Sequence, residues 1–257
     1  MAQELYRSFS LELPILFRDE HYVAVHKPGG LLVHRTRIAE DAKEFAMQIL
    51  RNQLNQWVYP LHRLDRGTSG VLLFALHKEA AQRLGVVFEE AQADKSYLAV
   101  LRGYVPEAGL VDYALREEKY KAPQEARTGY RRLATAELPI PVGRYQTARY
   151  SLVEARPLTG RMHQIRKHFA HLCHYVIGDR RHGDWRHNQM FAEKLACPHL
   201  LLHARQLTFP HPFTGALTSV TAPLPEYWLR LAPTLGWEEV LKGPAGGGYN
   251  GLPGREA

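Results

Sequence analysis

The stretch from Val71 to Leu76 is a continuous apolar run of strand length, and it follows directly on the polar segment 62–70. A short apolar run bounded by turn residues is typical of a buried strand. The polar segment holds two arginines, an aspartate and the sequence Gly-Thr-Ser-Gly, which together are typical of a loop. The sequence therefore predicts a charged loop fixed at the start of a buried strand.

Strand and helix patterns mix along the rest of the chain without a strict βαβ rhythm. The apolar spacing predicts helices and strands at the following residues: helices over 45–54, 80–91 and 161–172, strands over 97–100 and 149–155, and hairpins over 15–25 and 200–221. Residues 106–147 are broken repeatedly by Gly and Pro, which predicts a poorly packed insertion with short strands. These elements indicate an α+β fold with a mixed, largely antiparallel sheet and flanking helices.

A chain of 257 residues is long enough for one large domain or two small subdomains. We expect residues 1–242 to form a single catalytic domain, divisible into two subdomains. Residues 243–257 are rich in Gly and Pro and are expected to be disordered.

The charge balance points to a polyanionic partner. The chain has 33 Lys and Arg against 26 Asp and Glu, a net charge of +7, which favours nucleic acid or an anionic membrane surface. No apolar run approaches the ~20 residues that a membrane span needs. The two cysteines, Cys173 and Cys197, form no CxxC pattern, as suits a reducing cytosol. We therefore expect a cytoplasmic protein with no membrane partner.

Asp65 stands between Arg63 and Arg66 in the charged loop. An isolated Asp–Arg pair most often does no more than stabilise a turn. Here two cations favour the ionised carboxylate, and the same arginines offer contacts to phosphates. Holding a carboxylate charged inside a loop that binds a polyanion is costly unless the charge is used. Asp65 is therefore the candidate catalytic group.

The nonapeptide His62–Gly70, HRLDRGTSG, closely resembles the signature of the RluA-type pseudouridine synthases, in which the carboxylate of this motif is catalytic. Other segments resemble further motifs of that family and follow in the family's order: Val23–Val33, Lys95–Tyr97, Thr159–Arg166, Ile177–Asp179 and Leu202–Ala204. The resemblance covers about residues 14–225. It implies a pseudouridine synthase fold with a central catalytic cleft, and isomerisation of uridine to pseudouridine in RNA.

Within the family, the chain most resembles the members that modify a uridine in the T-arm stem of tRNA, at tRNA position 65. The shared features are Leu32–Arg35, Gly143–Tyr145 and Ile177–Asp184. Many relatives have Pro in place of Arg35 and Tyr in place of His182, and no RNA-binding module of the S4 type precedes the first expected strand. These differences favour tRNA as substrate, with the same reaction on ribosomal RNA as the alternative.

The reaction sets what each catalytic group must do. It breaks the N1–C1′ bond, rotates the uracil and joins C5 to C1′, without redox change or added water, so neither a cofactor nor a metal is expected. The resemblance implies that Asp65 acts on the ribose, either as nucleophile at C1′ or as the base that opens a glycal route. Tyr97 offers a ring to stack on uracil and a hydroxyl to relay the C5 proton. Arg166 lies at the edge of an apolar helix face and needs an anionic partner, which the resemblance identifies as Asp65.

A uridine inside a stem must be flipped out before it can react, at a cost of roughly a few kcal/mol. Arg63 is placed to enter the vacated stack, and Leu202 matches the family's residue at the floor of the uracil pocket. The other expected substrate contacts lie beside the catalytic loop or are basic side chains that hold phosphates: His62, Arg66, Arg35, Arg180 and Arg181, with Arg37, Arg186, His182 and His187.

Two hypotheses of other classes remain open. A non-catalytic RNA-binding protein on the same scaffold would function without Asp65. A metal-dependent hydrolase would use the histidines near the third helix, which are His163, His168, His171 and His174. These histidines lack an i, i+4 pair and are joined by no pattern of Cys, Asp or Glu ligands. We therefore expect a metal-free enzyme that acts on tRNA as a monomer.

Overall fold

The computed structural model describes residues 12–34, 44–117 and 120–243. The strands are β1 (Ile15–Arg18), β2 (Tyr22–Lys27), β3 (Tyr59–Pro60), β4 (Ser69–Ala75), β5 (Asp94–Arg102), β6 (Ala108–Asp112), β7 (Arg127–Leu138), β8 (Ala148–Pro157), β9 (Leu202–Pro210) and β10 (Leu217–Thr221). The helices are α1 (Ala46–Leu54), α2 (Lys78–Glu89), α3 (Gln164–His171), α4 (Trp185–Lys194), α5 (Glu226–Leu235) and α6 (Glu238–Lys242). Apart from Gly243, the expected disordered tail lies outside the described residues.

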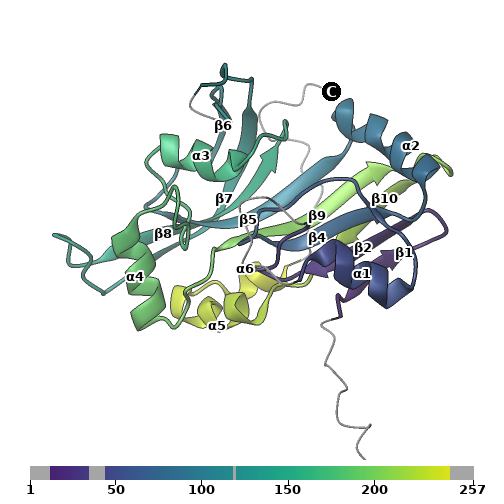
Figure 1. Cartoon of the computed structure of the whole chain (residues 1–257). Helices are drawn as coiled ribbons and strands as arrows, with labels where there is room; N and C mark the ends of the chain where they lie inside the picture. The colour runs from purple at the N-terminus through teal and green to yellow at the C-terminus, as the bar shows by residue number, and fades with distance from the viewer. Residues whose placement is uncertain (1–11, 35–43, 118–119, 244–257) are drawn as a thin grey trace, which may run out of the picture.

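The described strands form one sheet in the order β1-β2-β4-β9-β5-β8-β7-β6, with β3 paired to β4 and β10 to β9. The pair β4–β9 is parallel, and the other pairs are antiparallel. The prediction of a mixed, largely antiparallel sheet with flanking helices is confirmed. Figure 1 shows α2 and α3 above the sheet and α1 and α5 below it.

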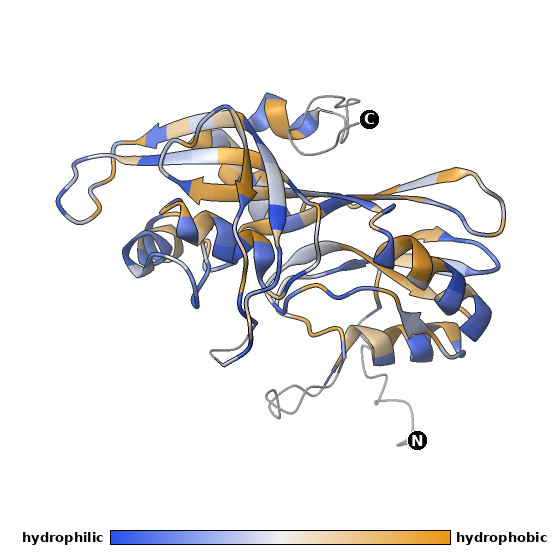
Figure 2. Ribbon diagram, turned by 90° about the horizontal axis from the view of Figure 1, so that it is seen from above, coloured by the Kyte–Doolittle hydropathy of each residue, from blue (hydrophilic) through white to orange (hydrophobic). Residues whose placement is uncertain are grey.

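The predicted buried strand is β4, in which all seven residues are buried. Alternate side chains of a strand point to opposite faces. Leu72 and Phe74 therefore pack with α1 on one face, while Val71 and Leu73 pack with α2 on the other. Figure 2 shows by colour that hydrophilic and hydrophobic residues alternate along the helices. The loop that precedes β4 is thus attached to a strand that is packed against a helix on each face.

Gly70 joins the two halves of the sheet. The parallel contact between β4 and β9 consists of only two residue pairs, Ser69 with His203 and Gly70 with Ala204. Gly70 has a φ of +118°, and a Cβ at this position would overlap the backbone carbonyl of Ala204. Only glycine permits both this backbone conformation and this approach. The last residue of the catalytic-loop motif therefore lets the loop reach the second half of the sheet.

Gly70→Ala is expected to lower the free energy of unfolding by at least ~3 kcal/mol, since it adds backbone strain and a clash with β9. The matched control is Gly85→Ala in α2, where a Cβ would meet nothing within 4 Å. Alanine in a helix interior stabilises by about 0.5–1 kcal/mol relative to glycine. Urea unfolding of the two variants should give changes of opposite sign, and equal changes would refute the role of Gly70.

The prediction for residues 106–147 is wrong. β7 has twelve residues and pairs with β8 along most of its length. The pairing runs from Thr128, opposite Pro157, to Leu138, opposite Ala148. The Gly and Pro residues lie mainly outside this strand, and Gly109 of β6 makes room for the ring of Tyr130, which would collide with a Cβ there. The glycine therefore serves packing between strands and does not break the structure.

Two further differences concern helices. The third predicted helix begins at Gln164 because His163 before it adopts a left-handed conformation with a φ of 57°. The helices α4, α5 and α6 were not predicted. Among the residues described, none of the helices combines the length and the apolar character that crossing a membrane requires.

Candidate active site

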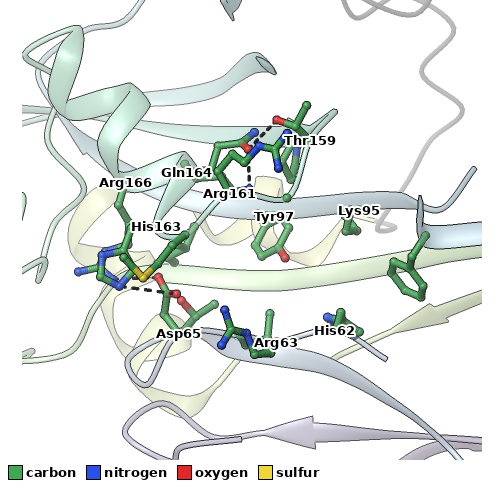
Figure 3. A pocket seen from close by; sticks show the side chains of 18 of the residues that line it. His62, Arg63, Asp65, Lys95, Tyr97, Thr159, Arg161, His163, Gln164 and Arg166 are labelled. Carbon is green, nitrogen blue, oxygen red and sulfur yellow. Dashed lines mark hydrogen bonds and ion pairs between the residues drawn. The ribbon is translucent and has the colours of Figure 1, made fainter. Parts of the chain in front are cut away.

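A cavity of about 940 Å³ lies between the loop before β4, the start of α3, strand β5 and the end of α2. Its walls include the three predicted catalytic residues and four of the predicted substrate contacts: Asp65, Tyr97, Arg166, His62, Arg63, Arg66 and Leu202. Figure 3 shows Asp65 and Arg63 on one side of the cavity, Arg166 at one end and Tyr97 across from Arg63. Residues from separate parts of the sequence thus meet in one cleft.

The Arg166 side chain links two carboxylates. Its Nη1 donates to Asp65 Oδ2 at 2.9 Å, so the ion pair expected from the sequence is present. Its Nε and Nη2 donate to the two oxygens of Asp179, each at 2.7 Å. A bidentate pair of this kind fixes the plane of the guanidinium. The orientation of Arg166 toward Asp65 is therefore set from behind by Asp179.

Asp179 is itself held rigidly, with its side chain only 1% exposed. Its Oδ1 accepts the backbone N–H groups of Arg181 and His182 at 2.9 and 3.0 Å. Burial alone would raise the pKa of Asp179, but the hydrogen bonds from Arg166 and from these backbone groups lower it below its usual value. Gly178 before it has a φ of +79° and has no room for a Cβ against His199. The sequence pattern Ile-Gly-Asp supports the family resemblance, but it does not by itself indicate this role of the aspartate.

Lys27 is a second group that sequence reasoning missed. The side chain is fully buried at the end of β2. Its Nζ donates to three backbone carbonyls, those of Pro28 and Leu31 at 2.8 Å and that of Arg66 at 3.2 Å. The lysine therefore ties the loop after β2 to the catalytic loop. Burial lowers the pKa of Lys27 to about 7, although the nearby charge of Asp65 opposes this shift.

Lys27→Met should destabilise the protein by about 1–3 kcal/mol, because three carbonyls lose their donor. The pKa of the lysine is about 7 when folded and near 10.5 when unfolded, so between these values the unfolded state binds more protons. The lysine's contribution to stability therefore rises from about pH 7 to about pH 10. Urea unfolding across this range should show the rise in wild type and a smaller one in the variant. Identical pH profiles would contradict the assignment.

Tyr97 lines the cavity from β5 and is half-buried. Burial, reinforced by the charge of Asp65, raises the pKa of its hydroxyl far above the usual value. The hydroxyl is thus a donor at neutral pH and a poor base by itself. The Tyr97 hydroxyl therefore suits a proton relay, in which it accepts one proton as it donates another. Leu202 is buried at the start of β9, on the same cavity wall.

His62 has a structural place in the cavity wall. Its Nε2 accepts the backbone N–H of Leu73 at 3.1 Å, and its ring stacks on Phe88 with centroids 5.6 Å apart. Burial lowers the pKa of His62 to about 3, so the ring is neutral. Arg63 and Arg66 line the cavity and are exposed to solvent.

The remaining expected phosphate contacts divide into three groups. Arg180, Arg181 and Arg186 are exposed and His182 is half-buried, and all four lie outside the wall of the cavity. Arg35 and Arg37 lie outside the described residues. His187 is buried and its Nδ1 bonds the Tyr150 hydroxyl at 2.9 Å, so it is not available to a phosphate.

The histidines considered as metal ligands are engaged with protein groups. His163 Nδ1 bonds His182 Nε2 at 2.9 Å, and His163 Nε2 lies 3.9 Å from Asp65 Oδ1. Burial lowers the pKa of His163 to about 4, against the opposing charge of Asp65. His168 bonds Thr128 inside the core. Within the described part of the chain, no three His, Cys, Asp or Glu side chains are grouped so as to hold a metal.

The matching family model is that of the RNA pseudouridylate synthases, and it covers residues 21–171. The chain belongs to this family, which confirms the resemblance found in the motifs. It is 48% identical to tRNA pseudouridine synthase C of Yersinia pestis, over 89% of this chain and 93% of that protein. It is 44% identical to the tRNA pseudouridine synthase C of Vibrio parahaemolyticus, over 90% and 98% respectively.

Solved structures agree with this assignment. Human RNA Pseudouridylate Synthase Domain Containing 4 matches with a TM-score of 0.66 at 26% identity, covering 87% of this chain and 93% of that one. Human RNA Pseudouridylate Synthase Domain Containing 1 matches with a TM-score of 0.66 at 25% identity, covering 84% and 85%. The protein is therefore an RNA-modifying isomerase with the pseudouridine synthase fold.

Proposed function

We propose that this protein converts one uridine of tRNA, at position 65 in the T-arm stem, to pseudouridine, with Asp65 as the essential catalytic group. The observation that carries the proposal is a carboxylate held by Arg166 at 2.9 Å inside a cavity that also contains Tyr97. The relatives named tRNA pseudouridine synthase C, which align over nearly the whole chain, support tRNA as the substrate.

The two oxygens of Asp65 differ in their surroundings. Oδ2 accepts from Arg166, while Oδ1 accepts no side-chain hydrogen bond from the described residues and lies 3.9 Å from His163 Nε2. Oδ1 is thus the oxygen left to act on the ribose. Arg166 keeps the carboxylate oriented, and a fixed cation of this kind costs no reorganisation during the reaction.

Two reaction routes account for every bond that forms and breaks. In the first, Oδ1 bonds to C1′ as the N1–C1′ bond breaks, and C5 of the rotated uracil then displaces the carboxylate. In the second, Asp65 removes the C2′ proton as uracil leaves, and returns it once C5 has joined C1′. In both, C5 loses its proton and N1 gains one, which gives the hydroxyl of Tyr97 its place as a relay.

We assign the surrounding groups by their positions. Tyr97 and Leu202 contact the uracil ring, and Arg63 enters the base stack that the uridine leaves. His62 shapes the wall, and Arg66 contacts the backbone beside the flipped nucleotide. Exposed Arg180 and Arg181 hold phosphates further away, and Arg35 is assigned the same role from the sequence alone.

We further propose that the protein acts in the cytoplasm as a monomer, without metal or cofactor. One chain supplies every group named in the mechanism, so no second copy is needed to complete the cavity. Residues 1–242 are proposed to act as one catalytic domain, because the sheet that carries the cavity is continuous. Sedimentation of the protein, alone and with tRNA, measures its mass in solution and so tests whether it acts as a monomer.

Site-resolved mapping of pseudouridine in RNA from cells with and without this protein tests the substrate. We expect one pseudouridine to be lost, at position 65 of tRNA, with ribosomal RNA unchanged. Loss confined to ribosomal RNA would favour the alternative substrate. An unchanged map, together with RNA binding by the purified protein, would favour the non-catalytic hypothesis.

A further inference from the structure

The hairpin that joins β7 to β8 meets the start of α4 outside the cavity. Figure 1 shows this hairpin at the left edge of the molecule, with α4 beside it. Its tip is closed by hydrogen bonds between the backbones of Val142 and Tyr145, at 3.0 and 3.3 Å. At the tip, a Cβ on Gly143 would stand 3.5 Å from Arg186 Nη1. Two segments far apart in the sequence, the hairpin tip at residues 143–145 and the start of α4 at residues 185–186, therefore come together in space.

Each segment presents an arginine stacked on an exposed aromatic ring. The guanidinium of Arg186 lies 5.8 Å from the ring centroid of Trp185, which is 67% exposed. The guanidinium of Arg144 lies 5.1 Å from the ring centroid of Tyr145, which is 56% exposed, and its Nη2 donates to the tyrosine hydroxyl at 2.9 Å. A guanidinium held in this way loses less side-chain entropy when it binds an anion. We call Arg144, Tyr145, Trp185 and Arg186 the hairpin–α4 surface.

The carboxylate of Asp184, the N-cap residue of α4, does not cancel these charges. Asp184 caps α4 by accepting the backbone N–H of Arg186 at 3.0 Å. Its other oxygen pairs with Arg102 Nη1 at 2.8 Å. Asp184 is thus neutralised by a third arginine, and the hairpin–α4 surface keeps a net positive charge. Paired arginines of this kind on an exposed surface match the charge and the geometry of phosphate groups.

A short loop connects the hairpin–α4 surface to the cavity wall. His182 bonds His163 in the cavity wall, and Trp185 follows three residues later in the chain. The exposed Arg180 and Arg181 lie in the same connecting loop. A chain of phosphates leaving the cavity on this side would therefore pass basic residues as far as the hairpin tip.

We propose that the hairpin–α4 surface binds the sugar–phosphate backbone of the RNA substrate beyond the flipped uridine, with Arg144 and Arg186 each contacting a phosphate. The proposal rests on the proposed function, since the RNA that reaches this surface enters from the cavity. A phosphate is the expected ligand, not a base, because each ring already holds its own guanidinium. The surface raises the affinity for the RNA and helps to position it, and it takes no part in the chemical step.

The test is the double variant Arg144→Gln/Arg186→Gln, with tRNA binding measured over a range of salt concentrations. Removing one arginine–phosphate interaction should lower the slope of log K against log salt by about 0.7–0.9, so the slope of the double variant should fall by roughly 1.4–1.8. The Kd at low salt should rise by about tenfold or more. The single-turnover rate at saturating tRNA should stay within about twofold of wild type.

The chain offers a matched control in Arg51→Gln. Arg51 lies 4.1 Å from the ring centroid of Trp57, which is also 67% exposed, but neither lines the cavity. This variant should bind tRNA as wild type does. A second variant, Trp185→Ala, keeps the charge but frees Arg186, so it should weaken binding without changing the salt slope.

A double variant with wild-type affinity and salt slope would overturn the proposal, as would an equal effect of Arg51→Gln. A protein partner for this surface would give the first of these results. A short oligonucleotide carrying only the target uridine should bind the double variant and wild type equally. If wild type binds tRNA but forms no pseudouridine, the proposed function fails, while the comparison of binding still tests this surface.

Discussion

Replacing Asp65 by asparagine is expected to lower the rate of pseudouridine formation by at least about a thousandfold, or ~4 kcal/mol in the barrier. The amide keeps the size of the side chain but has no charge to act on C1′ or C2′. RNA binding should persist within about tenfold, or ~1.4 kcal/mol, because binding depends on the basic residues around the cavity. Single-turnover kinetics and a separate binding assay measure the two effects.

Asp94→Asn is the matched control for this experiment. Asp94 is as exposed as Asp65, with 27% against 26% of the side chain accessible, and it also pairs with an arginine, Arg156, at 3.3 Å. It does not line the cavity. The Asp94 variant should turn over normally. A near-normal rate for the Asp65 variant would remove Asp65 from the mechanism.

Replacing Arg166 by methionine is expected to have the second large effect. Activity should fall because Asp65 loses the cation that orients it. The free energy of unfolding should fall by about 3–5 kcal/mol, since Asp179 is left buried without its partner. Asp179 accounts for most of this loss, because its side chain is 1% exposed while that of Asp65 is 26% exposed. Arg161→Met, an exposed arginine of the same cavity wall, should cost less than ~1 kcal/mol.

The loss on replacing Arg166 should depend on pH. In wild type the pKa of Asp179 is lowered on folding, so the pair stabilises above the unfolded value and this contribution is lost as pH falls. Without Arg166, burial raises the pKa of Asp179, and its contribution is lost as pH rises instead. The free energy of unfolding of the Arg166→Met variant should therefore fall further below that of wild type near about pH 7 than near about pH 4. Thermal melts that show no such change would contradict this account.

A double-mutant cycle of Arg166→Met and Asp179→Asn separates the pair from its surroundings. Because the two side chains share two hydrogen bonds of 2.7 Å, we expect a coupling energy of about 0.5–3 kcal/mol. Simple addition of the two single effects would mean that Asp179 does not position Arg166.

The parts of the site that the sequence revealed could be recognised from the residues of one short segment. Asp65, with its arginines on either side and the strand after it, forms a local pattern whose chemistry can be judged within nine residues. Arg166 was found because a charged residue on an apolar helix face needs a partner. The partner Asp65 came from the family resemblance, and the ion pair at 2.9 Å is present.

The parts that were missed depend on contacts between distant segments. Asp179 reaches Arg166 through a separate loop, and nothing in its own neighbourhood marks it as buried. Lys27 looks like the polar end of a strand, yet it is fully buried and binds carbonyls of another loop. Gly109 resembled a break in structure because the ring of Tyr130 that fills its space comes from a different strand. Spacing along one segment carries no information about such partners.

The most direct test of the central claim follows the fate of the hydrogen on C5 and of the uracil base. Purified protein is incubated with tRNA that carries tritium at C5 of its uridines. Because C5 becomes the carbon bonded to C1′, we predict release of one tritium per tRNA, with no free uracil and an unbroken chain. Release of free uracil would show hydrolysis of the glycosidic bond. Tight tRNA binding without tritium release would show that the cavity binds RNA and does not isomerise it.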